Sequence, residues 1–124
     1  MAYDERLAAR IRELLDERPD VTERKMFGGL AFLVGGTMAV AASARGGALV
    51  RVDPAESDAL VARTGAELAV MGGRPIDGWV RVGATDLATR RQLARWVDLG
   101  VGRALALPAK AARRRAVAPR RVPS

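Results

Sequence analysis

The stretch KMFGGLAF, residues 25–32, decides the fold because two adjacent glycines interrupt a run suited to a β-strand. A strand interior normally avoids glycine, which loses more chain entropy on folding and brings no side chain to pack. The pair Gly28-Gly29 therefore predicts a β-bulge or a place where a neighbouring group approaches the backbone closely. The functional alternative is a backbone surface that contacts a ligand or a partner strand.

A second glycine-rich stretch, MGGRPIDGW at residues 71–79, has the composition of a tight loop that feeds a strand. Arg74 follows two glycines and precedes a proline, so we expect a rigid loop to present its guanidinium group. Pairing with Asp77 or Asp53 is one interpretation, and bidentate binding of a carboxylate or phosphate is the other. Trp79 and Trp96 are expected in the core or at an interface.

Residues 4–18 carry apolar side chains at the spacing of one helix face, and Pro19 ends that helix. Residues 26–34, 37–43 and 48–52 read as three strands. Gly-Gly pairs separate them, and such pairs supply the positive φ angles that hairpin turns need. A three-stranded antiparallel meander is therefore expected.

The second half of the chain predicts a helix at 54–64, strands at 67–71 and 78–82, and a last helix from 85 or 86 to 107. Gly100 and Gly102 each weaken that helix by about 1 kcal/mol, so a kink or an early end is expected there. The fold class is α+β. We expect two layers, an antiparallel five-stranded sheet with helices on one face, in the order α-β-β-β-α-β-β-α.

Cysteine and histidine are both absent from the sequence. The chain therefore lacks a thiol nucleophile, the commonest general base and the commonest metal ligand. No phosphate-binding loop or dinucleotide fingerprint is found either. We predict a non-enzymatic protein with no cofactor and no metal. No apolar run reaches the roughly 18 residues of a membrane span, and the start does not resemble a signal peptide, so a cytoplasmic protein is expected.

Most of the net charge of +7 comes from the end of the chain. We expect a folded domain at 1–107, whose formal charge is only +1, and a mobile basic tail at 108–124. The tail could bind DNA or RNA without sequence preference, with a slope of log affinity against log salt near −5. The alternative is a solubilising end. The candidate phosphate-contacting residues of the tail are Lys110, Arg113, Arg114, Arg115, Arg120 and Arg121.

Three pieces of this sequence, in their order and spacing, resemble the N-terminal domain of the TfoX/Sxy family. The resemblance covers roughly residues 3–107. Its family-motif residues are Lys25, Met26, Phe27, Gly28, Gly29, Arg51, Asp53, Gly72, Gly73, Arg74, Pro75, Gly78 and Trp79. The resemblance implies a stand-alone N-terminal domain of helices and antiparallel sheet, without the second helical domain of the family's competence regulators.

The resemblance also implies regulation of transcription, of the kind that controls genes for DNA uptake, with a transcription factor or nucleic acid as partner. It supplies no catalytic residues. A second hypothesis is a small-ligand-binding or hydrolytic domain with a pocket near Gly28, Arg74 and Asp77. A third is a module that only forms homodimers, because an open sheet has edges that must be covered, charged or paired.

Overall fold

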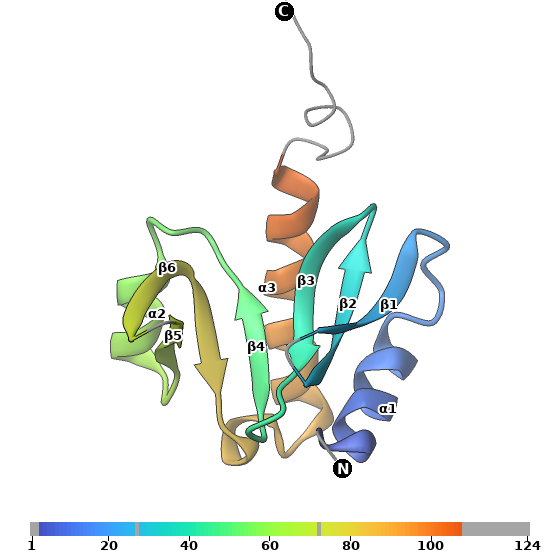
Figure 1. The fold of residues 1–124 in the computed structure, drawn as a ribbon, viewed down its shortest axis with the longest axis horizontal. Helices are drawn as coiled ribbons and strands as arrows, with labels where there is room; N and C mark the ends of the chain where they lie inside the picture. Colours follow the sequence, from blue (N-terminus) through green and yellow to red (C-terminus); the bar gives the residue numbers. More distant parts are fainter. Residues whose placement is uncertain (1–2, 27, 72, 108–124) are drawn as a thin grey trace, which may run out of the picture.

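The structure is a computed structural model that describes residues 3–26, 28–71 and 73–107. Helices and strands form two layers (Figure 1). The helices are α1 (Glu5–Leu14), α2 (Ser57–Arg63), the 3₁₀-helix η1 (Ala84–Leu87) and α3 (Arg90–Ala106). The strands are β1 (Val21–Met26), β2 (Gly29–Val34), β3 (Thr37–Ala42), β4 (Ala48–Arg51), β5 (Glu67–Met71) and β6 (Arg74–Val82).

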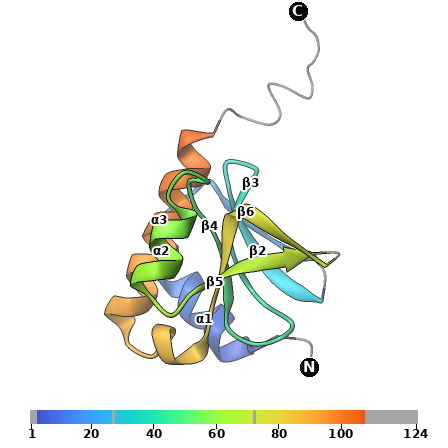
Figure 2. The same cartoon turned by 90° about the vertical axis from the view of Figure 1, so that its left-hand side faces the viewer.

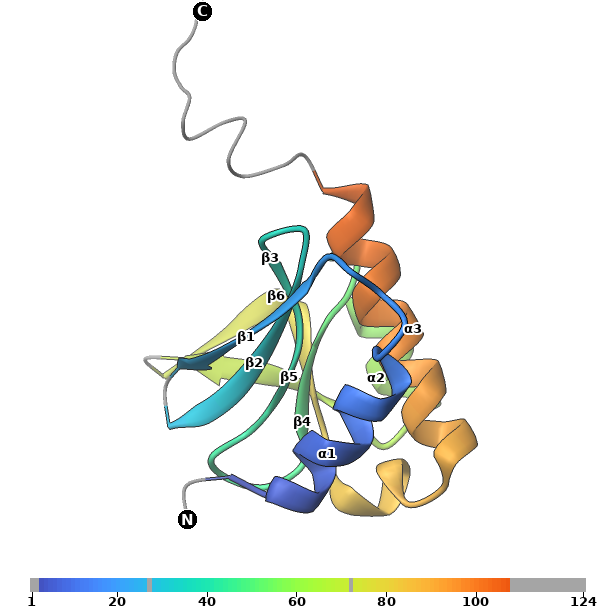
Figure 3. The same ribbon diagram turned by 90° about the vertical axis from the view of Figure 1, so that its right-hand side faces the viewer.

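The strands form one antiparallel sheet in the order β1-β2-β3-β4-β6-β5. Figures 2 and 3 show α1, α2 and α3 on the same side of this sheet. The predicted α+β architecture with helices on one face is therefore confirmed. The predicted count of five strands is wrong, because six are present among the described residues.

The missed strand is β1, whose sequence VTERKM carries mostly exposed polar side chains. It forms one edge of the sheet, where charged residues discourage pairing with another chain. Such a strand lacks the apolar alternation by which strands are recognised. The sequence analysis therefore assigned Met26 to the same strand as Leu30, whereas the chain turns between them.

The helices are shorter than predicted, α1 at its end and the other two at their start. Asp4 caps α1 by accepting hydrogen bonds from two backbone N–H groups, but the helix ends at Leu14 rather than near residue 18. Asp53 Oδ1 accepts from Ala55 N at 2.9 Å, yet that turn precedes α2 instead of opening it. The last helix begins later than predicted, because η1 occupies 84–87 and Thr89 forms a capping box with Gln92.

The hydrophobic core lies between the sheet and the helices. Phe32 and Val40 are fully buried in the middle of the sheet, and Ile11 of α1 and Leu93 of α3 close over that face. The longest helix, α3, packs on β3 and β4. It approaches the sheet closely at Gly100, where an added Cβ atom would lie 2.4 Å from the carbonyl oxygen of Ala39.

The early end of α3 that the sequence predicted at Gly100 is therefore wrong. The helix continues to Ala106, and the missing side chain lets it approach the strand below.

Among the described residues, no helix is long and apolar enough to cross a membrane.

Candidate functional site

The helix-free side of the sheet carries a surface that we call the open face. In a strand, alternate side chains point to opposite sides, so the neighbours of the core residues Phe32, Val50 and Val80 point away from the helices. The half-buried side chains that define the open face are Leu33, Met38, Leu49, Arg51, Trp79 and Arg81.

One row of directly paired residues crosses the open side of all six strands. It runs through Arg24, Ala31, Ala41, Leu49, Arg81 and Glu67. Its middle is small and buried, since Ala31 is 1% and Ala41 is 7% exposed. Charged side chains stand at both ends. The centre of the row is therefore already closed to water, and the larger neighbours Leu33, Met38 and Trp79 supply the accessible apolar atoms.

Arg51 and Trp79 form the best-defined contact of the open face. They are opposite each other in the β4–β6 pairing, and the Arg51 guanidinium carbon lies 4.3 Å from the centre of the indole ring. This is the geometry of a cation–π interaction. Arg51 Nε also donates a hydrogen bond to the carbonyl oxygen of Met38 at 2.7 Å. Burial lowers the pKa of Arg51, and the charge of Arg103 adds to this effect. Arg51 nevertheless keeps its charge near neutral pH.

A bulge in β6 places Trp79 opposite Arg51. The β5–β6 pairing passes from Ile76 opposite Ala69 to Val80 opposite Leu68, so residues 77–79 have no partner on β5. Gly78 adopts φ +89° in this bulge, and its carbonyl oxygen accepts a hydrogen bond from Val52 N at 2.8 Å. Two pieces of the motif, residues 51–53 and 74–79, therefore meet in space.

Arg81 is the second oriented cation of the open face. Its Nη1 lies 3.2 Å from the hydroxyl oxygen of Ser43, and its Nη2 lies 3.5 Å from the carbonyl oxygen of Gly46. Ser43 is 7% exposed. Arg51 and Arg81 are thus oriented by neutral oxygens, and neither forms an ion pair among the described residues.

The first motif piece lies in the β1–β2 hairpin, far along the strand order from β6. Gly28 adopts φ +78° in the turn, and an added Cβ at Gly29 would lie 2.4 Å from the carbonyl oxygen of Ala42. The close approach predicted from Gly28-Gly29 is confirmed at Gly29, the first residue of β2, while Gly28 lies in the turn before that strand. Lys25 and Met26 end β1, and Lys25 is exposed. Phe27 lies outside the described residues.

The β5–β6 hairpin carries the remaining motif residues. Gly73 has φ +79° in its turn, and Arg74 and Pro75 open β6 as exposed residues. The expected ion pair of Arg74 with Asp77 or Asp53 does not occur among the described residues. Gly72 and the tail residues 108–124 fall outside the described parts of the chain.

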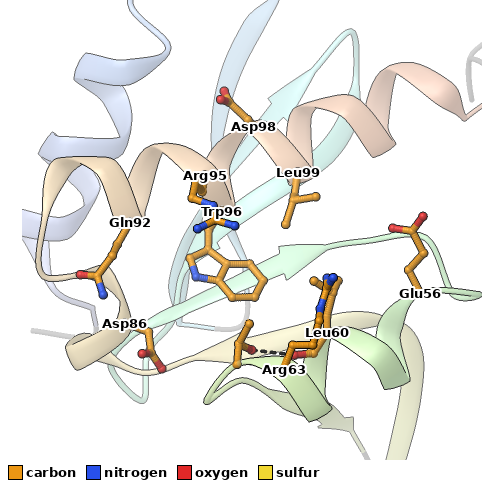
Figure 4. A pocket seen from close by; sticks show the side chains of 10 residues that line it. Glu56, Leu60, Arg63, Asp86, Gln92, Arg95, Trp96, Asp98 and Leu99 are labelled. Carbon is orange, nitrogen blue, oxygen red and sulfur yellow. Dashed lines mark hydrogen bonds between the residues drawn. The ribbon is translucent and has the colours of Figure 1, made fainter.

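A second surface is a groove between α2 and α3, which Figure 4 shows from close by. This open groove has a volume of about 790 Å³ and includes none of Gly28, Arg74 and Asp77, near which the alternative pocket was expected. Its apolar residues are Leu60, Trp96 and Leu99. Its polar and charged residues are Glu56, Arg63, Thr64, Asp86, Gln92, Arg95 and Asp98. In the parts of the chain that the structure describes, no group of three or more acidic side chains could hold a metal ion.

The sequence analysis did not single out several residues of the open face and of the groove. Reading the alternation of strands 30–34 and 48–52 would have placed Leu33 and Leu49 on the side opposite Phe32 and Val50. No comparable signal exists for the groove. Leu60 and Trp96 are 36 positions apart, and only the packing of α2 beside α3 brings them together.

These features define a two-layer α+β domain whose sheet has one helix-covered face and one face that presents apolar and arginine side chains. The sequence model of the TfoX N-terminal domain family matches residues 13–104, which are most of the chain. The chain therefore belongs to the TfoX N-terminal domain family, which is not known as a family of enzymes. No curated protein matches the chain. No solved structure matches it either.

Proposed function

We propose that this TfoX N-terminal domain is a non-catalytic, cytoplasmic regulator of transcription that acts by binding another protein through its open face. The observation that supports the proposal most is the oriented pair of Arg51 and Trp79 beside exposed apolar atoms. Tryptophan and arginine are enriched among the residues that contribute most to protein–protein binding. The partner would be a transcription factor with an apolar surface and carboxylate groups that meet Arg51 and Arg81.

The charge of the chain favours this mode over sequence-specific reading of DNA. Residues 1–107 carry a formal charge of only +1, whereas duplex binding depends on many phosphate contacts by Lys and Arg. A role in DNA uptake is the form of regulation that the family resemblance implies. Genes for DNA uptake are therefore the first ones whose transcripts should be examined.

The test compares transcripts in the native cell with and without the gene. We expect a defined set of transcripts to change on deletion and to return with the wild-type chain. Leu49→Gln in the open face should fail to restore them. Leu105→Gln is the matched control, because Leu105 lies on α3 and is 56% exposed. Both variants are first checked for an unchanged fold by thermal unfolding. The proposal is wrong if deletion changes no transcript, or if the folded Leu49→Gln chain restores them fully.

Nucleic-acid binding by the basic tail is a separate hypothesis with its own measurement. Fluorescence anisotropy on a random duplex at several salt concentrations compares the full chain with a chain lacking residues 109–124. If the tail binds phosphates, its deletion should abolish most low-salt binding and leave thermal stability unchanged. Equal binding by both chains would show that the folded domain, and not the tail, contacts the nucleic acid.

Homodimerisation remains a prediction, and the edge strand β5 is the feature that favours it. Val70 on this strand is 53% exposed, and the outer edge of β5 has no neighbouring strand among the described residues. A partner strand added there would pair those backbone groups. Light scattering that gives a monomer mass at high micromolar concentration would exclude this mode.

A further inference from the structure

The groove between α2 and α3 has the size of a small-molecule site, and an apolar floor lies among its mostly polar and charged lining residues. Its volume of about 790 Å³ lies within the range of roughly 300–1,000 Å³ typical of ligand pockets. Leu60 is 5% and Trp96 is 7% exposed, so they form a firm apolar floor, and Leu99 is 37% exposed on the groove wall.

Two arginines from different helices face this floor. Figure 4 shows the ring of Trp96 directed from α3 toward α2, with Arg95 on one side of the ring and Arg63 on the other. The ion pairs found in the described parts of the chain involve Arg12, Arg18 and Arg90. Arg63 and Arg95 therefore have no acidic partner there.

The acidic residues of the groove lie away from this centre. Figure 4 shows Glu56 at one end, Asp86 at the other and Asp98 on the outer side of α3. A long polyanion such as a nucleic acid would meet these carboxylates, and like charges oppose binding. A compact anion placed between Arg63 and Arg95 would not.

We propose that the α2–α3 groove binds a small amphipathic organic anion. Its apolar body lies against Leu60, Trp96 and Leu99, and its carboxylate, phosphate or sulfonate group lies between Arg63 and Arg95. Hydrogen bonds between a guanidinium group and an anion are charge-assisted and stronger than neutral ones. The groove lies on the helix side of the molecule, so this site is separate from the open face.

The experiment uses the full chain and two dyes with the same ring body. Anilinonaphthalene sulfonate carries the anion, and phenylnaphthylamine is its neutral analogue. We expect saturable binding of the sulfonate. Arg63→Gln and Arg95→Gln should each weaken it by about tenfold, while the affinity of the neutral dye stays within about twofold. Arg91→Gln, an exposed α3 position that does not line the groove, is the matched control.

Three further measurements separate this site from binding elsewhere, including the basic tail, and identify the head group. Leu99→Ala should weaken both dyes by about threefold, because it removes apolar surface without charge. The NMR signal of the Trp96 indole N–H should shift on titration with the sulfonate, and that of Trp79 should not. Octanoate and octyl phosphate should displace the dye, and octanol should not. Whichever of the two anions displaces it at the lower concentration carries the preferred head group.

The proposal is overturned if Arg63→Gln and Arg95→Gln both leave the sulfonate affinity unchanged, or if Arg91→Gln weakens it equally. The proposal is also overturned if the Trp96 signal does not shift at saturation, or if neither octyl anion displaces the dye. Both arginines are exposed, so their glutamine variants should retain the fold.

Discussion

The two sides of the sheet are built from the same strands but differ in what covers them. On the helix-covered side, Phe32, Val40 and Val50 are fully buried under α3. On the open side, Leu33 and Leu49 stay half-buried although each is the chain neighbour of a core residue. The difference shows that the full burial of large apolar side chains in this sheet follows the position of the helices. The covered side supplies stability, and the open side leaves apolar and arginine atoms available for contact.

The largest expected effect contrasts two adjacent residues of β2. Phe32→Ala should lower the free energy of unfolding by about 4 kcal/mol, because it removes a fully buried ring and leaves a cavity. Leu33→Ala on the open side should lower it by only about 1 kcal/mol. Urea denaturation with unchanged slopes measures both values. Equal losses would mean that the open face is as tightly packed as the core.

The second contrast concerns two glycines of α3. Gly100→Ala should destabilise the domain by about 3 kcal/mol, because the new Cβ atom meets the carbonyl oxygen of Ala39 and the helix must move off the sheet. Gly102→Ala is the matched control. No atom lies within 4 Å of the Cβ position there, so it should stabilise the helix by up to about 1 kcal/mol. Thermal unfolding of both variants gives the sign, and destabilisation by both would contradict the close-approach argument.

These contrasts also mark what the sequence could and could not predict. The strands 37–43 and 48–52 and the Gly35-Gly36 turn were predictable, because β-favouring residues and paired glycines are local signals. Gly35 and Gly36 do have positive φ angles of +60° and +86°. The strand β1 was missed because its place at the sheet edge, and not its own sequence, determines that it pairs.

The candidate site was predictable only in part, for the same reason. Arg51 and Trp79 were singled out by motif, but their stacking depends on the β6 bulge and on β4 lying beside β6. Arg74 stood out in the sequence yet stays exposed and has no ion pair among the described residues. Local patterns predict turns and strand faces, whereas contacts between distant segments depend on the assembled sheet.

The third contrast compares two arginines on the open side, one that stacks on a tryptophan ring and one that is exposed. Arg51→Lys keeps the charge but loses the planar group that stacks on Trp79 and donates to Met38. We expect a loss of about 1 kcal/mol in the free energy of unfolding. Arg24→Lys, at an exposed position of β1 on the same side, should change it by less than about 0.3 kcal/mol. Chemical denaturation distinguishes them, and equal changes would show that Arg51 contributes only its charge.

The smallest expected effect lies at the edge of the covered side. Glu23 on β1 stands opposite Phe32 in the β1–β2 register and reaches across to α1. There its carboxylate accepts two hydrogen bonds from Arg12, one of them from Nη2 at 2.9 Å. The hydrogen bond from Arg12 lowers the pKa of Glu23, and the Arg12 charge acts in the same direction. A pair this exposed contributes about 0.5 kcal/mol.

The sign of its pH dependence follows from that lowered pKa. The contribution is fully present above the unfolded-state pKa of about 4.3 and is lost as the pH falls through the lower folded-state value. We therefore expect Glu23→Gln to cost about 0.5 kcal/mol near neutral pH and nearly nothing in strong acid, where the wild-type carboxyl is protonated as well. Glu17→Gln is the control, since Glu17 is exposed and makes no ion pair among the described residues. Urea denaturation of the three chains across this pH range provides the test. A Glu23→Gln deficit that persists unchanged in strong acid would show that shape, and not charge, couples β1 to α1.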